Sequence, residues 1–281
     1  MVMVSARTAE PVGALLRHWR ARRGLSQLAL SGLTGVSTRH LSFVETGRSG
    51  PSRDLVLRLC DHLDLELRER NRVLLAAGYA PAYPETSLDD PRMAEVRTAV
   101  GRMLTGHEPY PAVVVDRRWD LLDANAGIAL LTETVADHLL SPPVNVLRAS
   151  LHPEGMAPRI ANLGEWRAHL LGRLRRQAEV TDAADLRELY AELRSYPGDD
   201  GSAAESAPGG PGGPGDFVVP LRLRHGDREL SFFSTVATLG TPVDVTLAEL
   251  VVESFFPADA GTAEFLAARG RTGAVAAPPA G

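Results

Sequence analysis

The chain of 281 residues contains one cysteine and no lysine. A single cysteine excludes an intramolecular disulfide and any zinc site built from several cysteines. Cys60 lies in the apolar run 55–60, which favours a buried small hydrophobic side chain over a reactive thiol. The eight histidines include no pair at i, i+4. The sequence therefore predicts no metal site and no cofactor.

Long hydrophobic runs are also missing. No stretch approaches the roughly 18 apolar residues of a membrane-spanning helix, and the N-terminus lacks the apolar core of a signal peptide. We therefore expect a cytoplasmic protein that does not enter a membrane. Hydrophobic residues make up 44% of the chain, which is enough to build cores and excludes wholesale disorder. The length suits two modest domains better than one.

Positive charge is concentrated near the N-terminus. Residues 1–80 hold 12 arginines and 7 acidic residues, whereas residues 81–281 hold 18 arginines and 28 acidic residues. Most of the excess lies at or before Arg58, where nine arginines oppose three acidic residues. A basic segment joined to an acidic remainder indicates an anion-binding module carried by a different domain.

Five short helices are predicted within residues 11–78. Serines at positions 26, 37 and 52 each precede a helical pattern and can cap it, which predicts helices at 27–33, at 38–45 and after residue 52. Gly35 stands where the chain must reverse between the second and third helices. We expect Ala29 and Leu33 to face the interior there. Two short helices joined at a glycine are typical of a helix-turn-helix, whose second helix enters the DNA major groove.

The same segment resembles the Cro/C1-type, or xenobiotic-response-element-type, regulators. The matching stretches are residues 15–20, Gly24-Leu25-Ser26-Gln27-Leu28-Ala29, Gly35-Val36-Ser37 and residues 45–48, and the match continues through residues 51–63. This resemblance implies that the segment binds double-stranded DNA. It also implies contacts to DNA from Arg17, Arg20, Gln27, Ser37, Thr38, Arg39, His40, Ser42 and Arg48.

The resemblance gives each of these positions a role. Gln27 is expected to bind a phosphate and to brace the recognition helix, and three arginines (Arg17, Arg20 and Arg48) are expected at other phosphates. Base edges are expected to be read by Thr38, Arg39 and Ser42, with His40 beside them. Arg39 suits guanine O6 and N7, a pairing worth about 1–3 kcal/mol of discrimination. Glu45 is expected to cap a helix or to pair with an arginine.

Beyond a linker at residues 79–90, the pattern changes to strands and longer helices. Helices are predicted at 91–104, 125–135, 165–179 and 182–195, and strands at 111–124, 217–224, 228–238 and 243–256. Residues 197–216 contain seven glycines and four prolines, which predicts a disordered insertion. The segment 91–268 is therefore expected to form one α+β domain, followed by a disordered tail at 269–281.

The α+β segment resembles the ligand-binding domain of MmyB-like bacterial regulators. The resemblance rests on Val113 through Asn125, on Leu230 through Thr235 and on Phe255-Phe256-Pro257. It implies a PAS-like sensor fold that holds a ligand of the fatty-acid type. The whole chain is then a five-helix Cro/C1-type head followed by a PAS-like sensor domain.

Trp119 and Asn125 are the candidate ligand-binding residues. Trp119 alternatively packs as a core ring, and Asn125 alternatively caps the following helix. The four phenylalanines at 232, 233, 255 and 256 either pack the core or line a lipid pocket.

The sequence favours a one-component transcription regulator without enzymatic activity, bound to DNA as a homodimer whose half-sites lie about one turn, ~34 Å, apart. Two alternatives stay open: a DNA-binding head fused to an enzyme domain, and an antitoxin-like regulator that grips a protein partner.

Overall fold

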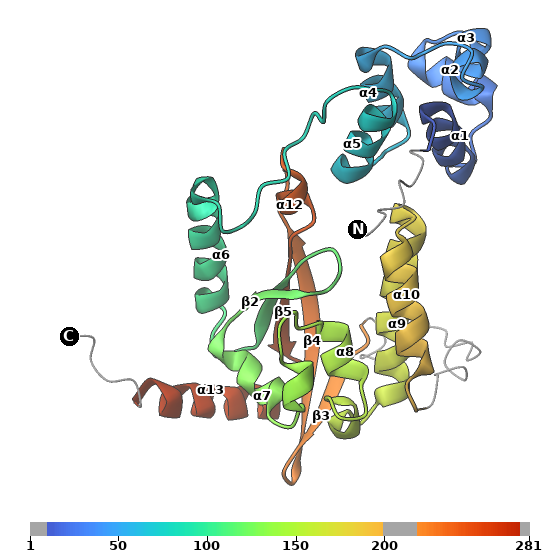
Figure 1. Ribbon diagram of the computed structural model, residues 1–281. Helices are drawn as coiled ribbons and strands as arrows, with labels where there is room; N and C mark the ends of the chain where they lie inside the picture. The colour runs from blue at the N-terminus through green and yellow to red at the C-terminus, as the bar shows by residue number, and fades with distance from the viewer. Residues whose placement is uncertain (1–9, 199–217, 276–281) are drawn as a thin grey trace, which may run out of the picture. The chain divides into compact units, whose positions relative to one another are not determined.

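The computed structural model describes residues 10–198 and 218–275, and the polypeptide divides into two compact units (Figure 1). The N-terminal unit comprises residues 1–86 and 241–248, and the C-terminal unit comprises residues 87–240 and 249–281. The division at Thr86 lies inside the segment 79–90 that was predicted as a linker. The predicted Gly/Pro insertion at 197–216 lies outside the described residues, apart from its first two.

Five helices build the N-terminal unit: α1 (Val12–Arg22), α2 (Gln27–Thr34), α3 (Thr38–Glu45), α4 (Arg53–His62) and α5 (Leu67–Ala76). The three predicted serine caps are confirmed. Ser26 Oγ accepts a hydrogen bond from Ala29 N at 3.0 Å, and the serines at 37 and 52 accept equivalent bonds at 3.2 and 3.3 Å. Gly35 ends α2 in the left-handed conformation with φ of 68°. Local signals therefore set the boundaries of the helix-turn-helix.

The prediction that Ala29 and Leu33 face the interior is wrong. Leu33 is 53% exposed and Ala29 is also exposed, whereas Leu30 and Thr34 are buried. The buried face of α2 includes Gln27, whose side chain reaches toward α3, so positions 27, 30 and 34 share the inner stripe. The interior of this unit is an apolar cluster formed by Leu15, Leu16, Trp19, Leu30, Leu41, Val44, Leu55, Val56, Leu59, Cys60, Leu63, Leu65, Val73 and Leu74.

Two small residues show how closely this core is packed. A Cβ on Gly13 of α1 would overlap the backbone oxygens of Val44 and Glu45, so only glycine permits this approach of α1 to α3. Cys60 is fully buried, and burial raises the pKa of its thiol to about 12. The thiol therefore stays protonated and serves as a small hydrophobic group.

The segment 241–248 belongs to the N-terminal unit although it joins two strands of the C-terminal unit. Helix α12 (Val245–Ala248) packs with α5. Asp244 Oδ2 accepts a hydrogen bond from Thr86 N at 3.1 Å, and Val245 N donates to Pro84 O at 2.8 Å. The prediction of a strand over 243–256 is therefore wrong in its first half. Asp244 Oδ1 accepts from Thr246 N, which favours a helical turn there.

The C-terminal unit is built on a five-stranded antiparallel sheet with the order β2-β1-β5-β4-β3. The strands are β1 (Ala112–Val115), β2 (Leu121–Ala124), β3 (Leu221–His225), β4 (Arg228–Thr238) and β5 (Val251–Pro257). The last strand in the chain thus lies at the centre, between β1 and β4. This arrangement confirms the expected α+β PAS-like fold.

Helices cover the sheet, and the side chains alternate between its two faces. The helical segments are η1 (Pro91–Met93), α6 (Ala94–Gly106), η2 (Ala126–Ile128), α7 (Ala129–Thr132), η3 (Asp137–Leu139), α8 (Val146–Leu151), η4 (Ala157–Arg159), α9 (Leu163–Thr181), α10 (Ala184–Ser195) and α13 (Ala260–Val275). Val114 and Val252 point to the α6 side, where they join a cluster with Val100 and Leu104. Val113 and Phe255 point to the opposite face, where the larger core lies.

Two predictions about helices need correction. The single helix expected at 125–135 is the short pair η2 and α7. The tail expected to be disordered from residue 269 is helical through Val275, as part of α13. Arg269 anchors this helix, because its Nη2 lies 2.8 Å from Glu133 Oε1. Within residues 10–198 and 218–275, no helix combines the length and apolar character needed to cross a membrane.

Asn125 ties the first hairpin of the sheet to α6 and does not cap η2. Its Oδ1 accepts from Ala112 N at 3.0 Å, and its Nδ2 donates to Leu104 O at 3.1 Å and to Tyr110 O at 2.8 Å. The side chain is 6% exposed. All of its hydrogen bonds are therefore made to buried or half-buried backbone groups.

Replacement of Asn125 tests this structural role. Asn125→Ala leaves the Ala112 N–H and the Tyr110 carbonyl without this partner and removes one of the donors to Leu104 O, so we expect a loss of about 3 kcal/mol in the free energy of unfolding. Asp123→Ala, on the exposed face of β2, is the matched control and should change it by less than about 0.5 kcal/mol. Urea unfolding of the full chain measures both. Equal stability of the two variants would contradict this assignment.

Candidate functional site

A buried carboxylate holds the helix-turn-helix together. Glu45, at the end of α3, accepts hydrogen bonds from Arg20 Nε at 2.6 Å, from Arg20 Nη2 at 2.9 Å and from Gln27 Nε2 at 2.8 Å. The Glu45 side chain is 1% exposed and that of Arg20 is 13% exposed. Burial acts to raise the pKa of Glu45, but the bonds from Arg20 and Gln27 outweigh it, so this pKa lies below its ordinary value. One carboxylate thus connects α1, α2 and α3.

This arrangement revises the role expected for Arg20. Its guanidinium forms a two-pronged bond to Glu45, and its Nη1 donates to Leu25 O at 2.7 Å. The hydrogen bond that Arg20 donates to Glu45 also raises the pKa of Arg20. Arg20 is therefore a bracing residue inside the N-terminal unit, and its contact to a phosphate stays a prediction. The expected pairing of Glu45 with an arginine is confirmed, and so is the expected brace from Gln27 to the recognition helix.

The other predicted DNA contacts lie on or beside α3. Arg17, Ser37, Arg39 and Arg48 are exposed, whereas Thr38, His40 and Ser42 are half-buried. Ser37 caps α3, and Thr38 Oγ1 donates to Ser31 Oγ at 3.2 Å, which links α3 to α2. The exposed part of this set forms a surface of arginines and hydroxyl groups that suits a nucleic-acid backbone and base edges.

Phe43 orients two of these arginines, and sequence reasoning missed it. The guanidinium carbons of Arg39 and Arg48 lie 5.4 and 5.9 Å from the centre of the Phe43 ring. Arg48 N also donates to Phe43 O at 2.8 Å, which folds the chain back after α3. Cation–π contacts of this kind favour a restricted set of arginine conformations. The signal in the sequence was an aromatic residue at i+4 from Arg39.

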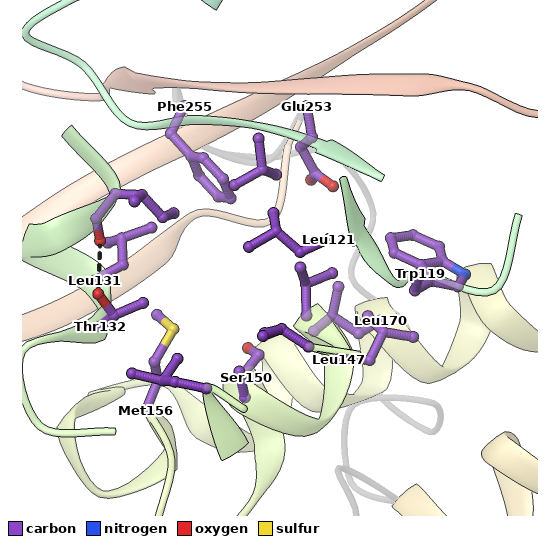
Figure 2. Close-up of a pocket in the computed structure, with 16 residues that line it drawn as sticks. Trp119, Leu121, Leu131, Thr132, Leu147, Ser150, Met156, Leu170, Glu253 and Phe255 are labelled. Carbon is purple, nitrogen blue, oxygen red and sulfur yellow. Dashed lines mark hydrogen bonds between the residues drawn. The ribbon is translucent and has the colours of Figure 1, made fainter. Parts of the chain in front are cut away.

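The C-terminal unit contains an apolar cavity between the sheet and its helices (Figure 2). Its volume is about 250 Å³, larger than the roughly 150 Å³ apolar cavity that admits benzene. Its wall comes from β1, β2, β5, α7, α8 and α9. The lining residues are Val113, Trp119, Leu121, Ile128, Leu131, Thr132, Leu140, Val144, Val146, Leu147, Ala149, Ser150, Met156, Leu170, Glu253 and Phe255.

Trp119 belongs both to the core and to the cavity wall. It is 7% exposed and joins the large apolar cluster of this unit. Its backbone has φ of 67°, a left-handed conformation that residues other than glycine rarely adopt. Its Nε1 donates to Gln177 Oε1 at 2.8 Å, and the Arg173 guanidinium lies 4.7 Å from its ring centre. The indole is thus fixed in orientation from α9.

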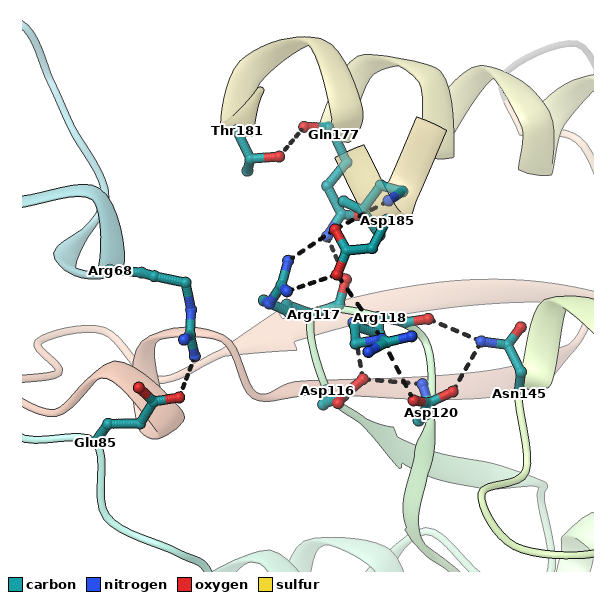
Figure 3. A network of polar contacts seen from close by, with 11 residues as sticks. Arg68, Glu85, Asp116, Arg117, Arg118, Asp120, Asn145, Gln177, Thr181 and Asp185 are labelled. Carbon is teal, nitrogen blue, oxygen red and sulfur yellow. Dashed lines mark hydrogen bonds and ion pairs between the residues drawn. The ribbon is translucent and has the colours of Figure 1, made fainter. Parts of the chain in front are cut away.

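A polar network stabilises the hairpin turn that carries Trp119 (Figure 3). Asp116 Oδ1 accepts from Arg118 N and from Asp120 N at 2.8 and 2.9 Å, which closes the turn. Asn145 Nδ2 donates to Arg118 O at 2.8 Å and to Asp120 Oδ1 at 3.0 Å. Arg117 Nη2 lies 2.6 Å from Asp185 Oδ2. These bonds hold the turn against α8, α9 and α10, which offsets the cost of the unusual backbone.

Glu253 is the one charged residue among those that line the described cavity. Its Oε1 accepts from Arg173 Nη1 at 3.0 Å, and the residue is 5% exposed. On the same helix as Arg173, burial and the neighbouring arginine lower the pKa of His169. That imidazole is therefore neutral at neutral pH. Sequence reasoning missed Glu253 because it stands in a strand of mostly apolar residues.

Some of the remaining predicted ligand residues line the cavity in the structure, and others do not. Asn125 is not among the cavity-lining residues, because its side chain is bonded to the backbone on the α6 side. Phe255 lines the cavity, whereas Phe232 is fully buried in the core. Phe233 stacks on Phe256 with ring centres 5.4 Å apart. One of the four phenylalanines therefore faces the cavity.

One group in the described part of the chain has metal-ligand composition. His138, His152 and Glu154 place their ligand atoms within 4.8 Å of one another. The sequence did not predict this group, because His138 lies 14 positions before His152 and the fold brings them together. His152 Nδ1 accepts a hydrogen bond from Glu154 N at 3.1 Å. This bond occupies the Nδ1 lone pair of His152, so that nitrogen is not offered to a metal. We assign no metal to this group.

Comparison with known proteins agrees with this architecture. The family described as "MmyB-like transcription regulator ligand binding domain" matches residues 96–268, and the family described as "Helix-turn-helix domain" matches residues 11–73. The chain belongs to the MmyB-like transcription regulators. As a member of this family it is a DNA-binding transcription regulator, with the cavity inside its ligand-binding domain.

Matches to individual proteins are weaker. A solved structure titled "Structure of an RNA-binding Light-Oxygen-Voltage Receptor" is similar at 14% identity with a TM-score of 0.26. The alignment covers 94% of this MmyB-like regulator and 65% of that receptor, so the chain spans less than two thirds of the receptor's length. No curated protein matches the chain.

The different positions of Arg17 and Arg20 lead to a direct test. Arg20→Ala leaves the Glu45 carboxylate buried without its cation, so we expect a loss of about 3 kcal/mol in the free energy of unfolding. Arg17→Ala, one turn earlier on α1 and exposed, should change that free energy by less than about 0.5 kcal/mol. Urea unfolding of the full chain is the measurement. The assignment fails if Arg17→Ala proves as destabilising as Arg20→Ala.

Proposed function

We propose that this protein is a one-component regulator in which the occupant of the C-terminal cavity controls DNA binding by the N-terminal unit. The observation that carries the proposal is an apolar cavity in the ligand-binding domain of a chain that also holds a helix-turn-helix. Such cavities with few polar groups are typical of small-molecule sites. Both the sensing and the DNA-reading functions then reside in one polypeptide of the cytoplasm.

The DNA-reading surface in this proposal is the exposed side of α3. Arg39, Thr38 and Ser42 read base edges, and Arg48 and Arg17 contact phosphates. Support comes from the exposure of the three arginines and from the Phe43 ring, which orients Arg39 and Arg48. A single small head makes few phosphate contacts, so the protein binds as a homodimer to half-sites about one turn apart, ~34 Å.

The ligand in this proposal is a small apolar molecule with a hydrocarbon chain, such as a fatty acid. Leucine, isoleucine, valine, methionine and aromatic side chains form most of the cavity wall. The carboxylate in that wall, Glu253, is paired with Arg173, an arrangement that suits a binding pocket without enzymatic activity. Binding here is driven by removing apolar surface from water.

A signal can pass from the cavity to the N-terminal unit along β5. Glu253 and Phe255 line the cavity from this strand, which begins at Val251. The segment 241–248 immediately precedes it and is bonded to Thr86 and Pro84 within the N-terminal unit. A ligand that displaces β5 therefore pulls on a segment packed with α5. In this proposal that segment is the connection through which the ligand changes DNA binding.

DNA recognition is tested on a palindromic operator obtained by genome-wide binding. Arg39→Ala should lose about 1–3 kcal/mol of discrimination against a substituted guanine position. Arg48→Ala should weaken binding to all sequences alike and reduce the salt slope by about one. Fluorescence anisotropy at several salt concentrations measures both effects. The proposal fails if neither variant changes DNA binding.

The connection through residues 241–248 is tested separately. Asp244→Ala removes the acceptor for Thr86 N, so the ligand response of operator affinity, expected to be at least about fivefold in the wild type, should shrink toward none. Val243→Ala, at an adjacent side chain that is 74% exposed, is the control and should keep the wild-type response. A full ligand response in Asp244→Ala contradicts this route.

A further inference from the structure

The cavity contains one unpartnered polar atom. Glu253 Oε1 bonds Arg173 Nη1, but no donor among the residues that the structure describes bonds Glu253 Oε2. The Glu253 side chain is 6% exposed. Its Oε2 atom is not completely covered by other protein atoms. Figure 2 shows Glu253 and Phe255 reaching from the same strand toward the apolar side chains. A buried carboxylate oxygen that faces open space is a site for a donated hydrogen bond.

The cavity wall offers no positive charge to a ligand. Among the sixteen described residues that line it there is no arginine and no histidine, and the chain has no lysine. Arg173 contacts two of the lining residues: it is bonded to Glu253, and its guanidinium lies 4.7 Å from the centre of the Trp119 ring. The neighbouring His169 is neutral because its pKa is lowered. Arg173 is thus already paired with a carboxylate of the protein, and His169 adds no positive charge beside the cavity.

The Glu253 carboxylate, without a free cation in the cavity wall, favours some polar end groups of an otherwise apolar ligand over others. A ligand carboxylate placed at Oε2 would set a second negative charge beside Glu253 in a site of low dielectric, with neither group able to donate a proton. The hydroxyls of Ser150 and Thr132 are neutral, so they do not cancel that charge. Ser150 Oγ accepts a hydrogen bond from Trp166 Nε1, and Thr132 Oγ1 donates to Ile128 O. An alcohol, by contrast, donates its O–H to Oε2.

We propose that the ligand of this cavity is a long-chain apolar molecule whose polar end is an uncharged hydroxyl, which donates a hydrogen bond to Glu253 Oε2. The inference rests on the proposed function, because it takes the cavity as the ligand site. It replaces the fatty acid expected for the site with a fatty alcohol or a similar neutral hydroxylated chain. Glu253 is the residue that determines this specificity, and Arg173 positions it.

A pair of probes with the same chain tests the proposal. Dodecanol and dodecanoate compete against an environment-sensitive apolar dye bound to the full chain, at about pH 8, where the acid is ionised. We expect wild-type protein to bind dodecanol at least about tenfold more tightly than dodecanoate. In Glu253→Gln the carboxamide carries no charge and can donate to a carboxylate. The preference should therefore fall at least about tenfold, with dodecanoate binding strengthened.

Glu229→Gln is the matched control, because Glu229 is on β4 with a side chain that is 51% exposed. It should keep the wild-type preference, and far-UV circular dichroism checks that each variant is folded. Equal or tighter binding of dodecanoate by the wild type overturns the inference and leaves the proposed function intact, since the acid then takes Arg173 from Glu253. Binding of neither probe by folded protein overturns both.

Discussion

The antiparallel pairing of β5 with β1 on one side and with β4 on the other is the constraint on which the C-terminal unit depends. This pairing sets the register that places Val113 opposite Glu253, with both side chains toward the cavity. The alternate residues, Val114 and Val252, fill the core under α6. A shift of one residue would turn Glu253 into that apolar core and Val252 into the cavity. The chemistry of the cavity is therefore a consequence of strand register.

The N-terminal unit depends on a different buried charge, that of Glu45. Its bonds to Arg20 and Gln27 fix the angle between three helices, so the arginines of this unit fall into two classes. Arg20 is bonded within the fold, whereas Arg17, Arg39 and Arg48 are exposed. A paired carboxylate sits in each unit, and in each an arginine neutralises it. The difference is that Glu45 has partners for both oxygens, whereas Glu253 has one oxygen left.

Features set by local sequence could be predicted, and features set by distant contacts could not. The serine caps and Gly35 determine helix boundaries within a few residues, so the helix-turn-helix follows from the sequence. The inner face of α2 was misplaced by one residue because Gln27 bonds a partner 18 positions away. The packing of Asp244 against Thr86 and the location of Glu253 at a cavity depend on contacts across more than 70 positions. The hydrophobic periodicity of a sequence gives no information about contacts between residues so far apart in the chain.

The central claim is that the state of the C-terminal cavity alters DNA binding. The most direct test removes apolar molecules from the purified full chain, verifies their removal by native mass spectrometry, and measures operator affinity with and without saturating dodecanol and dodecanoate. We predict that the probe that occupies the cavity changes the affinity at least about fivefold. An operator affinity that stays the same with the cavity empty and filled would contradict the account.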